Sequence, residues 1–227
     1  MASETWCEPR SGHTCEVESS NRDRAAVEVY DGMRRARQIN TMVKAGIMGA
    51  FAIALLVPIG HLEGKGMGFR APFFCGTALV VPLLQRVRPR RPYPHVADSL
   101  LVAPFLVDTI ANLAGIYDNY AVTDDVLHAV NWVLLVLAFH AFRFRAVCDN
   151  RDAWLLGAGF GALAIVGWEI AEWVVAETGS AGNLGLTYGD TIGDLALSSA
   201  GGTIGSALGV WLFGWRRPWR ERSPSQG

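Results

Sequence analysis

The chain has 227 residues, of which 51% are hydrophobic and 18% are charged, and its formal net charge is −1. This length suits either one soluble domain or a small helical bundle in lipid. The near-neutral charge, without a basic stripe interleaved with aromatic residues, predicts no nucleic-acid partner.

Residues 1–40 are polar throughout and lack the apolar core of a secretory signal. We therefore expect a disordered cytoplasmic segment here, followed by a first apolar run that stays in the membrane. Residues 41–215 are expected to form the membrane domain, and residues 216–227 a basic cytoplasmic tail.

Six apolar runs follow, each close to the roughly 20 residues that a helix needs to cross a bilayer. They are continuous rather than alternating, which favours helices over barrel strands. A soluble bundle would need polar helix faces, which FAIALLVPI and WVLLVLAF lack. The predicted fold is an all-α, polytopic membrane bundle of six transmembrane helices, at about 41–60, 66–84, 98–117, 125–142, 153–176 and 191–215.

Basic residues are concentrated in alternate connections between these runs. Of the 20 Lys and Arg residues, all but Lys65 and Arg70 lie on one side of the six-span arrangement. Basic loops stay on the cytoplasmic side, so the pattern predicts that both termini are inside. The second run is weak because it contains Pro72 and Pro82, but omitting it would put basic loops on opposite sides.

Several ionisable residues lie within or at the edges of the apolar runs, although a charge at a helix centre costs about 2.5–3.5 kcal/mol. At 1.5 Å per residue, all of them fall in the outer half of the membrane. Spacings of three or four residues put them on one stripe of each of four helices. We expect an outward-facing pocket that holds Asp108, Asn112, Asp118, Asp125, His128, Asn131, Glu169, Glu172, Asp190 and Asp194.

Single members of this set have simpler explanations. Asp125 and Asp190 suit helix N-caps or first turns, where the helix dipole favours acids. His128 alone would fit a packed, hydrogen-bonded histidine. Glu169 and Glu172 resist such an account, because two carboxylates one turn apart in GWEIAEWVV cannot both face lipid. The prediction of a pocket or a relay therefore depends mainly on these two glutamates.

Carboxylates and imidazole are ligands for divalent metals from Mg²⁺ to Zn²⁺. The candidate metal ligands are His128, Glu169, Glu172 and Asp194, and the candidate catalytic groups are Glu169, Glu172 and His128. A metal would polarise a phosphoryl or carbonyl oxygen of a lipid-linked or phosphate-bearing substrate at the outer leaflet. The sequence indicates no other cofactor.

Two other functions fit the same residues. Acid and histidine chains through a bundle can relay protons or cations in a transporter. Against this, the inner halves of the spans have few polar residues and no inverted repeat is visible. A structural or stress-response membrane protein would instead use the buried acids to fix helix register. The substrate, the reaction and the choice among these functions stay open at this point.

Gly201, Gly205 and Gly209 repeat every four residues in the last span. Such small-residue stripes allow helices to approach closely in lipid. Gly157 and Gly161 of the fifth span are candidates for the facing groove. The contact would form either within one chain or in a homo-oligomer.

Three motifs in order carry a family resemblance. Asp125 and His128 form DxxH, Glu169 to Trp173 form ExxEW, and Gly189 to Asp194 form GDTxxD ahead of a glycine-rich last helix. Over roughly residues 98–214, this order resembles the YjdF-type bacterial inner-membrane proteins and, more distantly, VanZ-like membrane proteins.

The resemblance implies a six-helix domain in the bacterial cytoplasmic membrane, surrounded by the lipid bilayer. It supplies no catalytic assignment, because the activity of these proteins is not established. Asp124 and Asp125 stand where a basic residue usually lies beside the first acid. This departure makes the mouth of the pocket more acidic and favours a cation there.

Overall fold

The computed structural model describes residues 13–143, 149–178 and 187–213, with side chains from residue 27 onward except that of Arg143. The described residues are helical and contain no strand, and six of their helices are long and apolar enough to span a membrane. The predicted all-helical, polytopic membrane bundle is confirmed. In chain order the elements are α1 (His13–Leu56), η1, a 3₁₀ helix (Gly60–Leu62), α2 (Met67–Val87), α3 (His95–Leu113), α4 (Ile116–Asn119), α5 (Thr123–Arg143), α6 (Asn150–Glu177) and α7 (Tyr188–Phe213).

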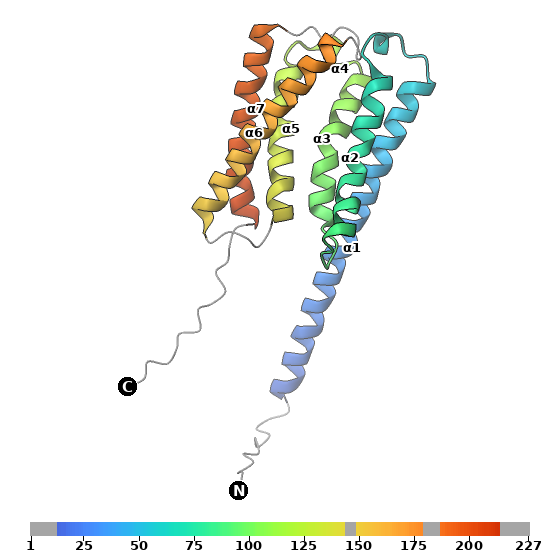
Figure 1. Cartoon of the computed structure of the whole chain (residues 1–227). Coiled ribbons are helices and arrows are strands. Elements are labelled where there is room, and N and C mark those ends of the chain that lie inside the picture. Colours follow the sequence, from blue (N-terminus) through green and yellow to red (C-terminus); the bar gives the residue numbers. More distant parts are fainter. Residues whose placement is uncertain (1–12, 144–148, 179–186, 214–227) are drawn as a thin grey trace.

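The helices form two groups of three (Figure 1). α1, α2 and α3 pack together on one side, and α5, α6 and α7 on the other. Contact between α3 and α5 joins the two halves. We call the end that holds η1 and α4 the α4 end. The opposite end holds the connection from α2 to α3, with its arginines, and we call it the arginine end.

The structure differs from the prediction at the start of the chain. Residues 1–40 were expected to be disordered, whereas α1 is helical from His13 onward. Opposite charges at helical spacing, as at Asp31 and Arg35, favour this extension. Residues 1–12 and the predicted tail, 216–227, lie outside the described residues.

Two spans end earlier at the α4 end than the sequence predicts. α1 ends at Leu56 because the next residue precedes Pro58, and residues before proline disfavour the α conformation. α3 ends at Leu113, two residues before Gly115, whose φ of 66° lies in the left-handed region that glycine adopts readily. This break separates α4 from α3 and turns the chain over the α4 end.

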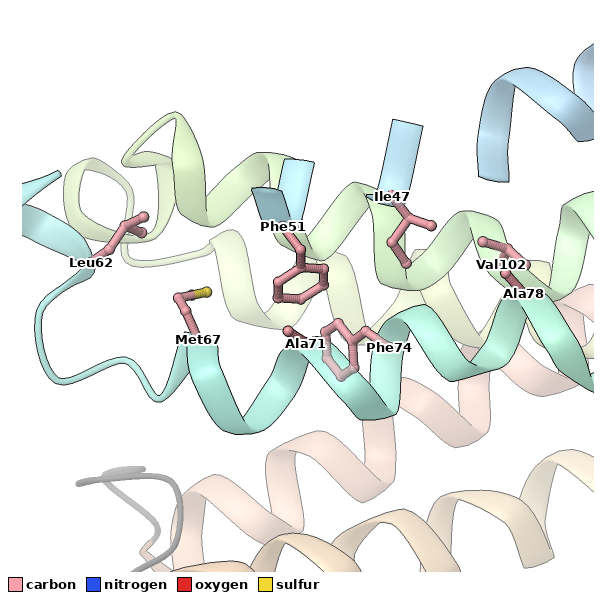
Figure 2. Packing of buried hydrophobic residues seen from close by; sticks show 8 residues of the cluster. All are labelled: Ile47, Phe51, Leu62, Met67, Ala71, Phe74, Ala78 and Val102. Atoms are coloured by element: carbon pink, nitrogen blue, oxygen red, sulfur yellow. The ribbon is translucent and has the colours of Figure 1, made fainter. Parts of the chain in front are cut away.

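Apolar side chains of α1, α2 and α3 form the core of one half, which Figure 2 shows from close by. Phe51 of α1 and Phe74 of α2 meet edge to face, with ring centroids 5.9 Å apart. Trp168 of α6 packs against the edge of the same cluster, 6.2 Å from the ring of Phe105 on α3. Aromatic contacts therefore link the two halves within the membrane.

One row of glycines on α7 packs directly against the backbone of α5. A Cβ added at Gly205 would lie 2.8 Å from the backbone oxygen of Val133. At Gly201 the added atom would collide with the backbone of Ala129, and at Gly209 with the ring of His140. Only glycine permits this approach, which explains the four-residue repeat.

A second row on α7 packs against α6. A Cβ added at Gly161 would lie 3.4 Å from Cα of Gly202, and one at Gly157 would collide with the hydroxyl of Ser206. The glycines of α6 thus face α7 within one chain. Both small-residue rows of α7 already have partners, so they do not supply the surface for the predicted homo-oligomer.

A buried ion pair joins α1 to α3 near the arginine end. Nζ of Lys44 lies 2.6 Å from Oδ2 of Asp98, a side chain that is fully buried. The hydroxyl of Tyr93 donates to the same oxygen at 2.6 Å. This carboxylate therefore has a cation and a donor in a place where an unpaired charge would be costly.

Gly201→Ala should destabilise the bundle, because the added Cβ would meet a backbone that cannot rotate away. We expect the free energy of unfolding in detergent to fall by about 1–3 kcal/mol. Gly193→Ala is the matched control on the same helix, with open space around its added Cβ, and should be neutral or stabilising. Equal stability of the two variants would contradict the packing of α7 against α5.

Asp98→Asn should also destabilise the protein, because it leaves Lys44 without its counter-charge. Removing one partner of a buried pair costs roughly 3–5 kcal/mol, and we expect the lower part of this range because the Lys44 side chain is 22% exposed. The double variant Lys44→Met/Asp98→Asn should recover part of the loss. The measurement is an unfolding titration in detergent. If Asp98→Asn had the same free energy of unfolding as the wild type, the pairing would be disproved.

Candidate functional site

A histidine and two carboxylates from α5 and α7 meet at the α4 end. Nε2 of His128 lies 3.4 Å from Oδ1 of Asp194 and 3.8 Å from Oδ1 of Asp124. One ligand atom from each of these residues lies within 4.8 Å of the others. We call the three residues the His128 cluster. The other ring nitrogen, Nδ1, lies 3.1 Å from the hydroxyl of Ser198.

The start of α5 and the glycine row of α7 position this cluster. The Thr123 hydroxyl donates to the carbonyl of Tyr120 at 2.7 Å, where α5 begins. Asp124 therefore lies in the first turn, and His128 follows one turn later on the same face. On α7, the close approach of Gly201 to α5 brings the preceding turns, and with them Asp194, toward His128.

Glu169 of α6 lies beside the cluster with one carboxylate oxygen that has no partner. Its side chain is 8% exposed, and Oε1 makes no hydrogen bond within the described ranges. Asp194 and His128 are among its electrostatic neighbours. Glu172, one turn further along α6, has both Glu169 and Asp194 as electrostatic neighbours. Buried polar atoms are usually hydrogen-bonded, so this oxygen is an acceptor available to a ligand.

A cavity of about 580 Å³ adjoins the cluster, between the two halves of the bundle. Its lining comes from α2 to α6 and includes two residues of the cluster, Asp124 and His128. The other polar lining residues are Lys65, Arg70, Asp108, Asn112, Tyr117, Asp118, Asn131 and Glu172. The aromatic lining residues are Phe69, Phe73, Phe74, Phe105, Trp132 and Trp168.

Asp108 of α3 is the centre of a second polar group in the cavity. Nη1 of Arg70 donates to Oδ2 of Asp108 at 3.4 Å, and Nδ2 of Asn112 donates to the same oxygen at 3.4 Å. The hydroxyl of Tyr117 donates to Oδ1. Tyr117 lies outside the spans, where burial and then the charge of Asp108 raise the pKa of its phenol. The phenol therefore stays protonated and remains a donor.

Lys65 and Asp118 form a second ion pair, at the rim of the cavity. Nζ of Lys65 lies 2.7 and 2.9 Å from the two carboxylate oxygens. These hydrogen bonds lower the pKa of the Asp118 carboxyl, which favours its charged form. Lys65 and Arg70, the two basic residues that depart from the loop pattern, are thus both paired with acids at the cavity.

The structure brings most of the predicted site residues together. Of the four predicted metal ligands, His128 and Asp194 belong to the cluster, whereas Glu169 and Glu172 are outside it. The cavity is lined by Asp108, Asn112, Asp118, Asn131 and Glu172. Oδ1 of Asn131 is a further buried atom that has no hydrogen-bond partner in the part of the chain that the structure describes.

Two predicted pocket residues do not line the cavity, although both are electrostatic neighbours of Asp124 and Asp194. Asp125 is exposed, and its neighbour Asp124 takes the position beside His128. Asp190 is also exposed and lies in the first turn of α7, where its backbone N–H donates to the Thr187 hydroxyl at 3.1 Å. Its placement matches that of a first-turn acid favoured by the helix dipole.

Sequence reasoning did not assign Asp124, Arg70, Lys65, Tyr117 or the aromatic wall to the site. A signal for one of them was present, because Arg70 is an arginine within an apolar run, on the side that otherwise holds only Lys65. An intramembrane charge indicates a partner or a function. The aromatic residues had no comparable signal, since apolar side chains are ordinary in a span.

A family model described as a predicted membrane protein, DUF2238, matches residues 42–214. The chain belongs to this family. The matched range includes every residue of the cavity and of the His128 cluster. It begins within α1, of which it covers residues 42–56. A search of curated proteins and a search of solved structures each found no match.

Proposed function

We propose that this protein binds a divalent cation and a phosphate-bearing substrate, soluble or lipid-linked, in a pocket open to the outer face of a bacterial cytoplasmic membrane. The observation that supports this best is the His128 cluster, in which two carboxylates and an imidazole from two helices meet beside a cavity. The YjdF-type and VanZ-like resemblance is a narrower proposal within the DUF2238 family.

The charge balance around the cluster favours a bound cation. Among the described residues, no Lys or Arg forms an ion pair with Asp124, Asp194, Glu169 or Glu172. Four acids in one region of a membrane domain need compensation by protons or by a cation. Oxygen ligands with one imidazole suit Mg²⁺, Mn²⁺ or Zn²⁺.

The neighbouring cavity supplies the groups that a phosphate substrate needs. Arg70 lines it, and guanidinium forms strong, directional hydrogen bonds to phosphate oxygens. Asp124 and His128 line the same cavity, so a substrate phosphate there would lie next to the cation. Bound metal polarises a phosphoryl oxygen and stabilises the charge that develops on it.

The carboxylates have distinct roles in this proposal. Asp124, His128 and Asp194 hold the cation. Glu169 is not part of this group of ligand atoms, and it is the candidate for a further ligand through Oε1, which makes no hydrogen bond within the described ranges. Glu172 lines the cavity and is the candidate general base, because it reaches the substrate space without belonging to the cluster. These assignments make the protein a metal-dependent membrane enzyme.

A structural role is the second candidate, and one contact favours it. The interactions of His128 with Ser198 and Asp194 join α5 to α7 and would hold helix register without any ligand. On that account, Glu172→Gln together with Asp194→Asn would lower stability but leave the cellular function intact. Cation or proton transport is a third alternative, supported by the same acids.

The predicted orientation can be tested by labelling single cysteines in intact cells, with the native cysteines replaced by serine. A cysteine at Glu63, between η1 and α2, should react with a membrane-impermeant maleimide from outside. A cysteine at Arg88, at the arginine end, should react only after the cells are permeabilised. The opposite result would place the pocket on the cytoplasmic side and overturn the outward-facing assignment.

The metal assignment predicts about one Mn²⁺ or Zn²⁺ per chain in purified protein dialysed against each metal. Asp124→Asn and Asp194→Asn should each weaken binding by roughly 10-fold or more, because each removes one charged ligand. Metal content by mass spectrometry and calorimetric titration would provide the measurement.

The chain offers matched controls for this experiment. Asp125→Asn and Asp190→Asn remove exposed acids on the same two helices and should leave metal binding unchanged. If all four variants bound equally, or if the wild type bound no metal, the cation site would be disproved.

A further inference from the structure

The cavity has a polar region and an aromatic region at different depths. Tyr117 and Asp118 of α4 lie at its α4 end. At 1.5 Å per residue, Phe105 lies about 12 Å along α3 from its end at Leu113. Trp168 lies about 14 Å along α6 from its end at Glu177. With a hydrocarbon core of about 30 Å, these rings lie at the depth of acyl chains.

The cavity is bordered by α2 and α6, two helices with little direct contact between them. Both helices line the cavity, but α2 and α6 are not among the helix pairs that pack extensively against each other. Aromatic side chains bridge them, with Phe73 and Phe74 of α2 lying 6.1 and 6.5 Å from Trp168 of α6. Phe73 is 57% exposed and Phe69, one turn earlier, is 43% exposed. Both side chains also line the cavity.

Arg70 lies where the polar and aromatic regions meet, and most of its N–H groups are available as hydrogen-bond donors. Its guanidinium carries five N–H groups. Within the described ranges its ion pair is a single long contact, from Nη1 to Oδ2 of Asp108 at 3.4 Å. Lys65, in contrast, is engaged by both oxygens of Asp118. Arg70 is therefore the cation best placed to bind an anionic group.

From these features we infer that the occupant of the cavity is a membrane amphiphile with a phosphate head group, which enters from the bilayer between α2 and α6. The phosphate binds Arg70 on the side of the His128 cluster, and the first part of the chain lies against Phe73, Phe105 and Trp168. A volume of about 580 Å³ accommodates the head group and the start of the chain, while the rest stays in the bilayer. This inference rests on the proposed function and narrows its substrate to the lipid-linked class.

Binding to the full-length protein in detergent tests this with three probes: dioleoyl phosphatidic acid, dioleoyl glycerol and inorganic phosphate. Native mass spectrometry should detect one phosphatidic acid per chain, bound at least tenfold more tightly than the uncharged diacylglycerol. Millimolar inorganic phosphate should not displace it. Equal affinity for the two lipids, or full displacement by inorganic phosphate, would overturn the inference.

Variants of α2 separate the specific site from general lipid binding. Arg70→Gln should weaken phosphatidic acid binding about tenfold or more and leave diacylglycerol binding unchanged. Arg86→Gln, an exposed arginine at the other end of the same helix, is the matched control and should have no effect. Equal effects of the two variants would contradict the assignment of Arg70.

Photolabelling of the wild type keeps the test independent of variants that fold poorly. A phosphatidic acid with a diazirine near the start of one acyl chain should label peptides around Phe73 and Trp168. Labelling spread over the outer faces of α1 and α7 instead would overturn the inference. Metal content of the same wild-type preparation separates the two proposals. The label at Phe73 and Trp168 in protein that binds no metal would refute the cation proposal alone, whereas metal binding without this label would refute the lipid occupant alone.

Discussion

Close contact between α7 and α5 is the constraint on which the proposed site depends. Gly201 and Gly205 let α7 approach the backbone of α5 directly, and Gly209 makes room for the ring of His140, so Asp194 and His128 come within 3.4 Å of each other. In lipid there is no hydrophobic drive to bring helices together, and such contact relies on small residues and polar bonds across the interface. The fold and the cluster therefore stabilise each other: packing positions the charged groups, and their interactions hold the register of the packing.

Charge placement explains much of the remaining architecture. The arginine end carries the loop arginines, and the buried Asp98 near it is neutralised by Lys44. At the α4 end, the two basic residues that break the loop pattern, Lys65 and Arg70, are paired with acids at the rim and wall of the cavity. The acids around His128 have no such Lys or Arg partner among the described residues. This imbalance is what distinguishes a candidate binding site from ordinary structural ion pairs.

The sequence predicted the number of candidate spans and the fold class, because these follow from the length of the apolar runs. It predicted less well which neighbouring residue points inward. Asp124 rather than Asp125 faces His128, since the start of α5 depends on a bond from Thr123 to a loop carbonyl that no periodicity reveals. The partner of Arg70 was also hidden, because it lies on another helix. Long-range contacts of this kind require the tertiary arrangement.

The most direct test of the central claim is a crystal structure of the protein grown with Mn²⁺, with an anomalous difference map calculated at the manganese edge. The account predicts one strong peak between α5 and α7, in contact with the carboxylates of Asp124 and Asp194 and with the ring of His128. A map without a peak there, or with these three side chains turned apart, would contradict it.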